Sequence, residues 1–334
     1  MPKQSRTLGM GEVEAVEHRR SMKAPFAQGL IEAQRKHGNV VTLTADLGKY
    51  TDVHPFRDFY PDRFFNVGMA EQALVTVAAG LAKTGHIAYC TTYGCFATRR
   101  AYDFLAIACA HGEADVKMFA ALPGITTGYG GTHQAIDDLA LMRAIPGMTV
   151  IDPCDATEMR QVASLAADIP GTLYCRLLRN EVPIVFGDDY RFELGKAKVV
   201  RGGGSVGIIS TGFMTERAID AAQALARDGI DIAVLHSPCI KPFDARGVAA
   251  FATNVERLVV VENHVSIGAL TSLVQDALQE AGILKPMLKI GIPDQFIECG
   301  SVPYLQDKYG LTTGKLVQRI GAWLGQRVAE PATA

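Results

Sequence analysis

The feature that most limits the fold of this chain is a regular alternation of short β-branched apolar runs with longer amphipathic stretches. In the first half, strand character is predicted for residues 40–45, 63–67, 86–92, 116–122, 149–153 and 172–178, and helical spacing for 71–83, 96–111 and 156–167. In the second half, strands are predicted at 205–210, 230–235 and 257–261, and helices at 215–228, 243–254 and 267–281. Such alternation is typical of parallel sheets covered on both faces. It predicts an α/β chain of two doubly wound domains with mostly parallel sheets.

Composition divides the 334 residues into four segments. Residues 1–22 are polar and mixed in charge, and are predicted to form an N-terminal tail or arm. Two domains are predicted at 23–185 and 197–330, and the stretch 186–196, rich in charge and glycine, is interpreted as a linker. The length suits two domains of ordinary size.

Charge and hydropathy argue against several classes of partner. The 33 basic and 35 acidic residues give a net charge of -2, without a basic run that would favour a nucleic acid. Apolar stretches end before the roughly 18 residues that a membrane span needs, and the N-terminus lacks an apolar signal region. The seven cysteines are scattered without a CxxC, so neither a zinc site nor a disulfide framework is indicated. We therefore expect a reduced, cytoplasmic protein that binds neither nucleic acid nor membrane.

The candidate site residues follow the ends of predicted strands, where open α/β sheets bind ligands. These positions hold Asp46, Glu71, Tyr93, Phe96 and a glycine-rich run that leads to His133. The sequence contains no phosphate-binding GxxxxGK[ST], no HExxH and no GxSxG, which argues against P-loop, zinc-protease and α/β-hydrolase chemistry.

Several motifs together resemble the transketolase family. They are VGMAEQ (67–72) at the start of a small-residue helix, Tyr93-x-x-Phe96-x-x-Arg99, ADLG (45–48), GGTHQ (130–134) and RLLR (176–179). The resemblance covers residues 23–325 and implies a thiamine-diphosphate-binding pyrimidine domain followed by a transketolase-type C-terminal domain. Each motif alone is weak, but the set is specific.

The resemblance implies a cofactor-binding role for five residues. Glu71 alone could simply stabilise a helix N-terminus, but in the family the matching carboxylate hydrogen-bonds the aminopyrimidine ring and so promotes loss of the thiazolium C2 proton. Tyr93 and Phe96 share one helical face and are expected to stack on the pyrimidine. Asp46 and Arg99 are expected nearby.

His133 and Arg179 are the expected substrate-binding residues. The resemblance implies that His133 hydrogen-bonds substrate oxygens at the catalytic centre and that Arg179 grips the phosphate of a sugar phosphate. The chain departs from the family at residues 121–123, which are Ala-Leu-Pro where transketolases usually carry His-Asp-Ser, and at Tyr129, where they carry Asp. These losses put the usual pentose phosphate substrates in doubt.

A further departure concerns the metal. In thiamine enzymes a Gly-Asp-Gly followed downstream by paired asparagines anchors the diphosphate through Mg²⁺ or Ca²⁺, and this sequence lacks that pattern. No metal site is therefore expected in this chain, and a separate N-terminal subunit is expected to supply it, in an assembly of two copies of each subunit. The expected activity is transfer of a two-carbon ketol unit from a ketose to an aldehyde.

Three alternatives remain open. The beta subunit of a 2-oxo-acid dehydrogenase has the same architecture, and dependence on a lipoyl domain would identify it. A deoxyxylulose-phosphate-synthase-like enzyme is a second alternative, although that enzyme is normally a single chain. The third is a non-catalytic relic, against which the retention of Glu71 argues.

Overall fold

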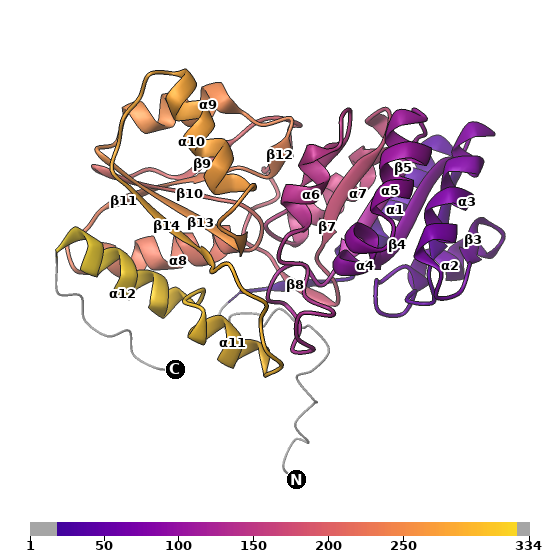
Figure 1. Cartoon of the computed structure of the whole chain (residues 1–334), viewed down its shortest axis with the longest axis horizontal. Helices are drawn as coiled ribbons and strands as arrows, with labels where there is room; N and C mark the ends of the chain where they lie inside the picture. Colours follow the sequence, from indigo (N-terminus) through magenta and orange to yellow (C-terminus); the bar gives the residue numbers. More distant parts are fainter. Residues whose placement is uncertain (1–18, 326–334) are drawn as a thin grey trace, which may run out of the picture. The chain divides into compact units, whose positions relative to one another are not determined.

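The computed structural model describes residues 19–325, which form two compact units. Unit 1 runs through Phe192 and also includes Ile297–Val302, whereas unit 2 comprises Glu193–Phe296 and the chain from Pro303 onward (Figure 1). Most of the predicted tail lies outside the described residues. Its last residues, however, belong to a strand, β1 (Ser21–Lys23), which pairs antiparallel with β8 (Glu181–Pro183).

Unit 1 is built on a parallel sheet. Its strands are β2 (Val40–Thr44), β3 (Phe64–Asn66), β4 (Ile87–Tyr93), β5 (Val116–Ala121), β6 (Thr149–Ile151) and β7 (Leu173–Leu177). They follow the order β6-β7-β5-β4-β2-β3, and every pairing among them is parallel. All residues of β2, β4, β5 and β7 are buried. A strand buried along its whole length needs cover on both faces of its sheet, as the near-continuous apolar runs predicted.

Helices supply that cover. They are α1 (Pro25–His37), α2 (His54–Phe59), α3 (Glu71–Lys83), α4 (Gly94–Arg99), α5 (Tyr102–Phe104), α6 (Asp138–Ala144) and α7 (Ala156–Leu165), with short turns η1 (Pro61–Arg63) and η3 (Ala166–Asp168). Helices α1 and α7 pack against each other. Gly29 permits their close approach, because a Cβ there would lie 2.2 Å from the carbonyl oxygen of Arg160.

The single helix predicted over 96–111 is three segments. Helix α4 ends at Arg99, Ala101 has non-helical torsions (φ -111°, ψ 14°), and α5 leads into a wide π-helical turn, η2 (Leu105–His111). Hydrophobic spacing cannot reveal such breaks, because the apolar pattern continues across them. The break changes which side chains share a face with Phe96.

The predicted linker is also partly structured. The backbone N–H groups of Val185 and Phe186 donate to the carboxylate of Asp155, the N-cap of α7, and the Tyr190 hydroxyl donates to Glu158. Residues 186–192 therefore belong to unit 1, and unit 2 begins at Glu193.

Unit 2 is a second layered α/β unit. Its strands are β9 (Lys198–Arg201), β10 (Val206–Ser210), β11 (Ile232–His236), β13 (Arg257–Val265) and β14 (Met287–Ile292), with a short β12 (Cys239–Lys241), and its helices are α8 (Met214–Arg227), α9 (Ala245–Thr253), α10 (Leu270–Glu280), α11 (Val302–Lys308) and α12 (Thr313–Leu324). The order is β14-β13-β10-β11-β9, with only the edge strand β9 antiparallel among these pairings. In Figure 1, α9 and α10 cover one face of this sheet and α8 and α12 the other.

The predicted fold class, two α/β domains with mostly parallel sheets, is confirmed. Within residues 19–325, no helix combines the length and the apolar character needed to cross a membrane. All seven cysteines lie in this range and are thiols rather than disulfides.

Candidate active site

The predicted site residues of unit 1 follow the carboxyl ends of neighbouring parallel strands. The register aligns Thr44 of β2 with Asn66 of β3, and Ala121 of β5 with both Tyr93 of β4 and Leu177 of β7. One edge of the sheet therefore presents the segments that carry the predicted residues, which are Asp46, Glu71, Tyr93, Phe96, Arg99, His133 and Arg179. This is the edge at which open α/β sheets bind ligands.

Glu71 is the first residue of α3 and is only 4% exposed. Gly68, at φ 76°, forms the turn that leads into the helix, a conformation that side chains with a Cβ rarely adopt. One oxygen of the Glu71 carboxylate lies 3.1 Å from an Nη1 of Arg100. The turn thus delivers a shielded carboxylate to the sheet edge, where a cation pairs with it.

Arg100 joins that carboxylate to an aromatic ring. Its guanidinium carbon lies 3.9 Å from the centroid of the Phe96 ring, within the range of a cation–π contact. The Arg100 side chain is 52% exposed, so it reaches the site from the solvent side. Sequence reasoning missed Arg100. The signal that could have found it is the i, i+4 spacing to Phe96, which brings side chains together on a helical turn.

Three aromatic side chains and His133 form one cluster. The Phe96 ring lies 5.6 Å from Tyr93 and 5.2 Å from His133, and the His133 ring lies 6.1 Å from Tyr93 and 5.3 Å from Tyr129. These separations are those of edge-on and offset aromatic contacts. The structure therefore brings three of the predicted residues, Tyr93, Phe96 and His133, together with Tyr129.

The cluster perturbs the titration of its polar members. Burial lowers the pKa of His133 and the nearby positive charge of Arg100 lowers it further, so the imidazole is neutral over a wider pH range. The Nδ1 of His133 lies 2.9 Å from the Thr132 hydroxyl, which fixes the ring through its neighbour. Burial raises the pKa of the Tyr93 phenol, although the charge of Arg179 works against this.

Asp46 stabilises the turn beside Glu71. It adopts a left-handed conformation (φ 58°), and its backbone N–H donates to the Asn66 side chain at 3.0 Å. The Asn66 amide donates back to the Asp46 carboxylate at 3.0 Å, and the N–H of Gly68 also donates to Asn66. Asn66 was not among the predicted residues, yet it ties the ends of β2 and β3 together.

Arg99 contacts the loop that carries His133. It pairs with Asp137 at 2.8 Å, and it donates to the carbonyl oxygens of Gly131 (2.8 Å) and Gln134 (3.5 Å). These contacts span the loop that carries His133. The structure places the neighbouring Arg100 against Phe96 and Glu71.

Arg179 is 6% exposed and lies within electrostatic range of Tyr93 and Asp52. Burial raises the pKa of Asp52, while a hydrogen bond from the N–H of Asn180 and the charge of Arg179 counteract the rise. Asp52 was not predicted from the sequence. A buried guanidinium at this edge is suited to bind an anion.

A buried ionic network supports the loop from β5 to α6. Arg176, near the carboxyl end of β7, pairs with Asp138 at 2.6 Å and with Asp152 at 3.3 Å, and the Tyr174 hydroxyl donates to Asp138 at 2.7 Å. Burial disfavours the charge of Arg176, but the two carboxylates more than compensate and raise its pKa. Since Asp138 is the first residue of α6, this network fixes the end of the loop that carries His133.

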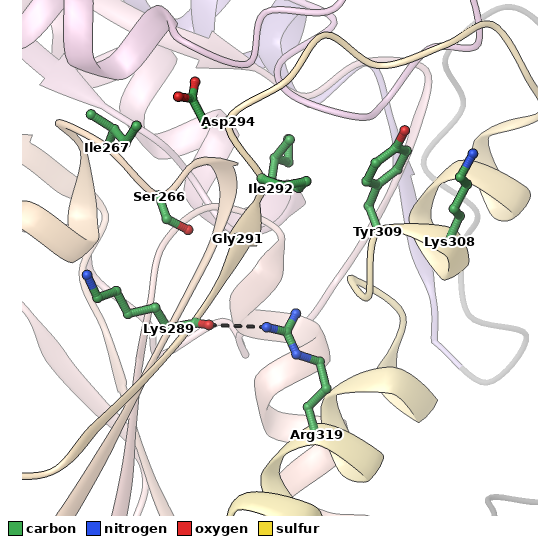
Figure 2. A pocket seen from close by; sticks show the side chains of 10 residues that line it. Ser266, Ile267, Lys289, Gly291, Ile292, Asp294, Lys308, Tyr309 and Arg319 are labelled. Atoms are coloured by element: carbon green, nitrogen blue, oxygen red, sulfur yellow. Dashed lines mark hydrogen bonds between the residues drawn. The ribbon is translucent and has the colours of Figure 1, made fainter.

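Unit 2 contains a pocket of about 460 Å³. Its lining combines cations, one carboxylate and apolar side chains, and it includes none of the predicted site residues. The lining residues are Ser266, Ile267, Lys289, Gly291, Ile292, Pro293, Asp294, Lys308, Tyr309 and Arg319. Figure 2 shows Arg319 reaching the backbone carbonyl of Lys289, to which it donates a hydrogen bond of 3.2 Å. Among residues 19–325, no group of three or more His, Cys, Asp or Glu side chains has the arrangement of a metal site.

Comparisons with known proteins agree with this architecture. The family described as "Transketolase, pyrimidine binding domain" matches residues 19–184, and "Transketolase, C-terminal domain" matches residues 195–316. A transketolase family protein of Sinorhizobium fredii is 49% identical over 306 residues, which are 91% of this chain and 89% of that protein. A 6-deoxy-6-sulfo-D-fructose transketolase subunit of a Clostridium species is 37% identical over 92% of this chain and 95% of its own length.

A solved structure agrees as well. A split-gene transketolase, described as an inactive beta4 tetramer, superposes with a TM-score of 0.82 at 36% identity, over 92% of this chain and 99% of that one. The two family matches divide the chain between its two units, and the relatives match it over nearly its whole length. The chain therefore belongs to the transketolase family and corresponds to its pyrimidine-binding and C-terminal domains.

Proposed function

We propose that this chain is the C-terminal subunit of a thiamine-diphosphate-dependent transketolase that transfers a two-carbon ketol unit from a ketose to an aldehyde. The observation that carries the proposal is the Glu71 carboxylate, shielded from water at a strand-end edge and facing a flat cation that is stacked on Phe96. When bound, thiamine diphosphate would supply an acidic thiazolium carbon whose conjugate base is a nucleophile toward carbonyl groups.

The residues in place fit an aminopyrimidine ring. The space between the Glu71 carboxylate and the Phe96 ring accommodates a planar group that donates N–H bonds and stacks, because the guanidinium of Arg100 makes both contacts there. An aminopyrimidine is also flat, and its ring nitrogen, when protonated, donates an N–H bond to a carboxylate. In this proposal Glu71 accepts a hydrogen bond from the ring and holds its proton in place, while Phe96 and Tyr93 supply apolar faces.

The other predicted residues surround this point. We propose that Asp46 lies close to the cofactor and, with Asn66, sets the turn before Glu71. Arg99 was predicted to contact the cofactor. Its contacts with Asp137 and Gly131 support an indirect role, in which it fixes the loop that carries His133. His133, kept neutral by burial and by Arg100, can donate or accept a hydrogen bond at a substrate oxygen.

The substrate proposal rests on Arg179 and on the altered loop. Arg179 is proposed to hold a terminal anion of the donor, with phosphate as the predicted group. Ala121 and Leu122 are buried apolar residues, and Tyr129 is 41% exposed beside His133. An apolar wall where relatives offer hydroxyl-binding groups supports a donor other than the usual pentose phosphates. The Clostridium relative, named for a sulfo-ketose, makes sulfonate the competing anion to test.

The diphosphate and its Mg²⁺ (or Ca²⁺) are proposed to be bound by a separate N-terminal subunit. The lack of the diphosphate motif supports this, as does the match to a split-gene transketolase. An assembly with two copies of each subunit, located in the cytoplasm, completes the proposal.

Reconstitution tests the proposal directly. The chain alone, supplied with thiamine diphosphate and Mg²⁺, should show no ketol transfer, whereas the chain mixed with an N-terminal transketolase subunit should turn over ketose donors. Parallel assays with phosphorylated, sulfonated and uncharged donors identify the anion. Turnover by the chain alone would contradict the split-subunit proposal, and acyl transfer that depends on a lipoyl domain would indicate a 2-oxo-acid dehydrogenase.

A further inference from the structure

We propose that Arg100 is an internal stand-in for the aminopyrimidine ring of the cofactor. In the free subunit its guanidinium occupies the place between Glu71 and Phe96, and entry of the ring displaces it. Arg100 thereby sets how tightly the cofactor is held. This inference rests on the proposed function, because it assigns the same place to a pyrimidine.

Two independent contacts locate the guanidinium. Its Nη1 donates to the Glu71 carboxylate at 3.1 Å, and its carbon lies 3.9 Å from the centroid of the Phe96 ring. A guanidinium is planar, stacks on aromatic faces and donates N–H bonds to a carboxylate. The guanidinium therefore pairs with the Glu71 carboxylate and stacks on the Phe96 ring at the same time. A second planar group cannot make these two contacts while Arg100 occupies that place.

Arg100 is also placed to leave. It follows the end of α4 and precedes the non-helical Ala101, and its side chain is 52% exposed, so it can turn into solvent without disturbing the core. The adjacent Arg99 differs, because Asp137 and two backbone carbonyls hold it. Arg99 is thus fixed to the His133 loop, whereas Arg100 occupies the place between Glu71 and Phe96.

The stand-in has an advantage before the cofactor arrives. Glu71 is buried, and a buried carboxylate without a compensating charge is costly. In the free subunit the charge of Arg100 compensates the Glu71 carboxylate, and its guanidinium covers one face of the Phe96 ring. The cofactor then has to replace this pairing, so its apparent affinity is reduced by the fraction of molecules in which Arg100 is in place.

The first test measures cofactor affinity rather than activity. In the complex with the N-terminal subunit, thiamine diphosphate is titrated at fixed Mg²⁺ by calorimetry. Arg100→Met removes the guanidinium and keeps an unbranched apolar side chain. Since the ion pair of the half-exposed Arg100 and its cation–π contact are both lost as competitors, affinity should rise roughly five- to tenfold. The control is Arg57→Met, which removes an exposed arginine paired with Asp58 and should leave affinity unchanged. A lower affinity in Arg100→Met would show that Arg100 holds the cofactor and would overturn the inference.

The second test uses the chain alone. An arginine-specific dicarbonyl reagent, followed by peptide mass spectrometry, reports how firmly Arg100 is held. Glu71→Gln should raise the labelling rate of Arg100 roughly two- to fivefold, because the ion pair that shields the guanidinium is lost. Arg57, in the same digest, should not change. An unchanged Arg100 rate would overturn the inference irrespective of the cofactor.

The two tests separate the possible failures. If labelling rises but no complex binds thiamine diphosphate, the proposed function is wrong and the stand-in role is overturned with it, and only the ion pair remains. If labelling and affinity both rise as expected, the inference is supported.

Discussion

Replacing Arg179 with alanine tests substrate recognition in the most specific way. Arg179 is buried at the strand-end edge, close enough to Tyr93 and Asp52 to influence their titration. If it holds the terminal phosphate of the donor, Arg179→Ala removes a charge-assisted contact that an uncharged donor never makes. The prediction is therefore a difference between two donors rather than a general loss of activity.

The magnitude follows from the type of contact. A hydrogen bond to a charged group is worth about 1.5–3 kcal/mol, and the burial of Arg179 limits competition from water. A loss of about 2 kcal/mol corresponds to a roughly 30-fold higher KM for the phosphorylated donor. Arg179→Lys keeps the charge without the planar fork and should fall between wild type and Arg179→Ala.

The assay compares kcat/KM for a ketose phosphate and for its unphosphorylated analogue in the reconstituted complex. The variant also removes a charge that lowers the pKa of Asp52, so circular dichroism should first establish that unit 1 remains folded. Arg57→Ala, an exposed arginine, is the control. If Arg179→Ala weakens both donors equally, Arg179 does not bind the phosphate.

Three further predictions concern unit 1. Arg176→Met should destabilise it by about 3–5 kcal/mol in urea unfolding, because the buried Asp138 and Asp152 lose their cation; a loss below about 1 kcal/mol, as for an exposed ion pair, would contradict this reading. Arg100→Met should raise the pKa of His133 in an NMR titration, because the charge of Arg100 lowers it, and an unchanged pKa would place the two groups apart. Burial raises the pKa of Asp155 from 3.8 to about 6. The contribution of this carboxyl to the free energy of unfolding is therefore fully present below pH 3.8 and is lost as pH rises through about 6. If the difference in unfolding free energy between wild type and Asp155→Asn does not vary over this window, the assignment is wrong.

The central strands of both sheets and about half of the helices could be predicted because their signals are local, whereas the edge strands β9 and β14 were not predicted. The apolar runs at 40–45 and 116–122 predict buried strands, and the structure has the buried strands β2 and β5 there. Helix α1, which packs against α7, was not predicted, because Gly29 and several polar residues weaken its apolar periodicity. The segment 186–192 looked like a linker by composition, yet hydrogen bonds to Asp155 attach it to α7. Contacts between residues distant in sequence decide such cases.

The same distinction applies to the site. Glu71, Tyr93, Phe96 and His133 were singled out because they belong to motifs that resemble the transketolase family, and the structure places their segments at the carboxyl ends of the parallel strands. Arg99 was chosen by assuming that one helical face continues past Phe96. Helix α4 ends at Arg99, and the residue that follows it, Arg100, lies over the Phe96 ring. Residues three and four positions after Phe96 both lie on its helical face, so helical spacing alone does not decide which of the two arginines covers the ring.

The central claim is that Glu71 activates the cofactor, and proton exchange tests it most directly. Glu71→Gln keeps the size and one acceptor oxygen but removes the carboxylate, and α3 should persist, because a helix-dipole contribution is worth only about 0.3–1 kcal/mol. The measurement is the rate at which the thiazolium C2 proton of bound thiamine diphosphate exchanges into deuterated water, followed by NMR on the reconstituted complex. Since acid–base groups contribute about 10²–10⁴-fold, exchange in the variant should fall by that order. Exchange near the wild-type rate in a complex that still binds the cofactor would mean that Glu71 only stabilises the start of its helix.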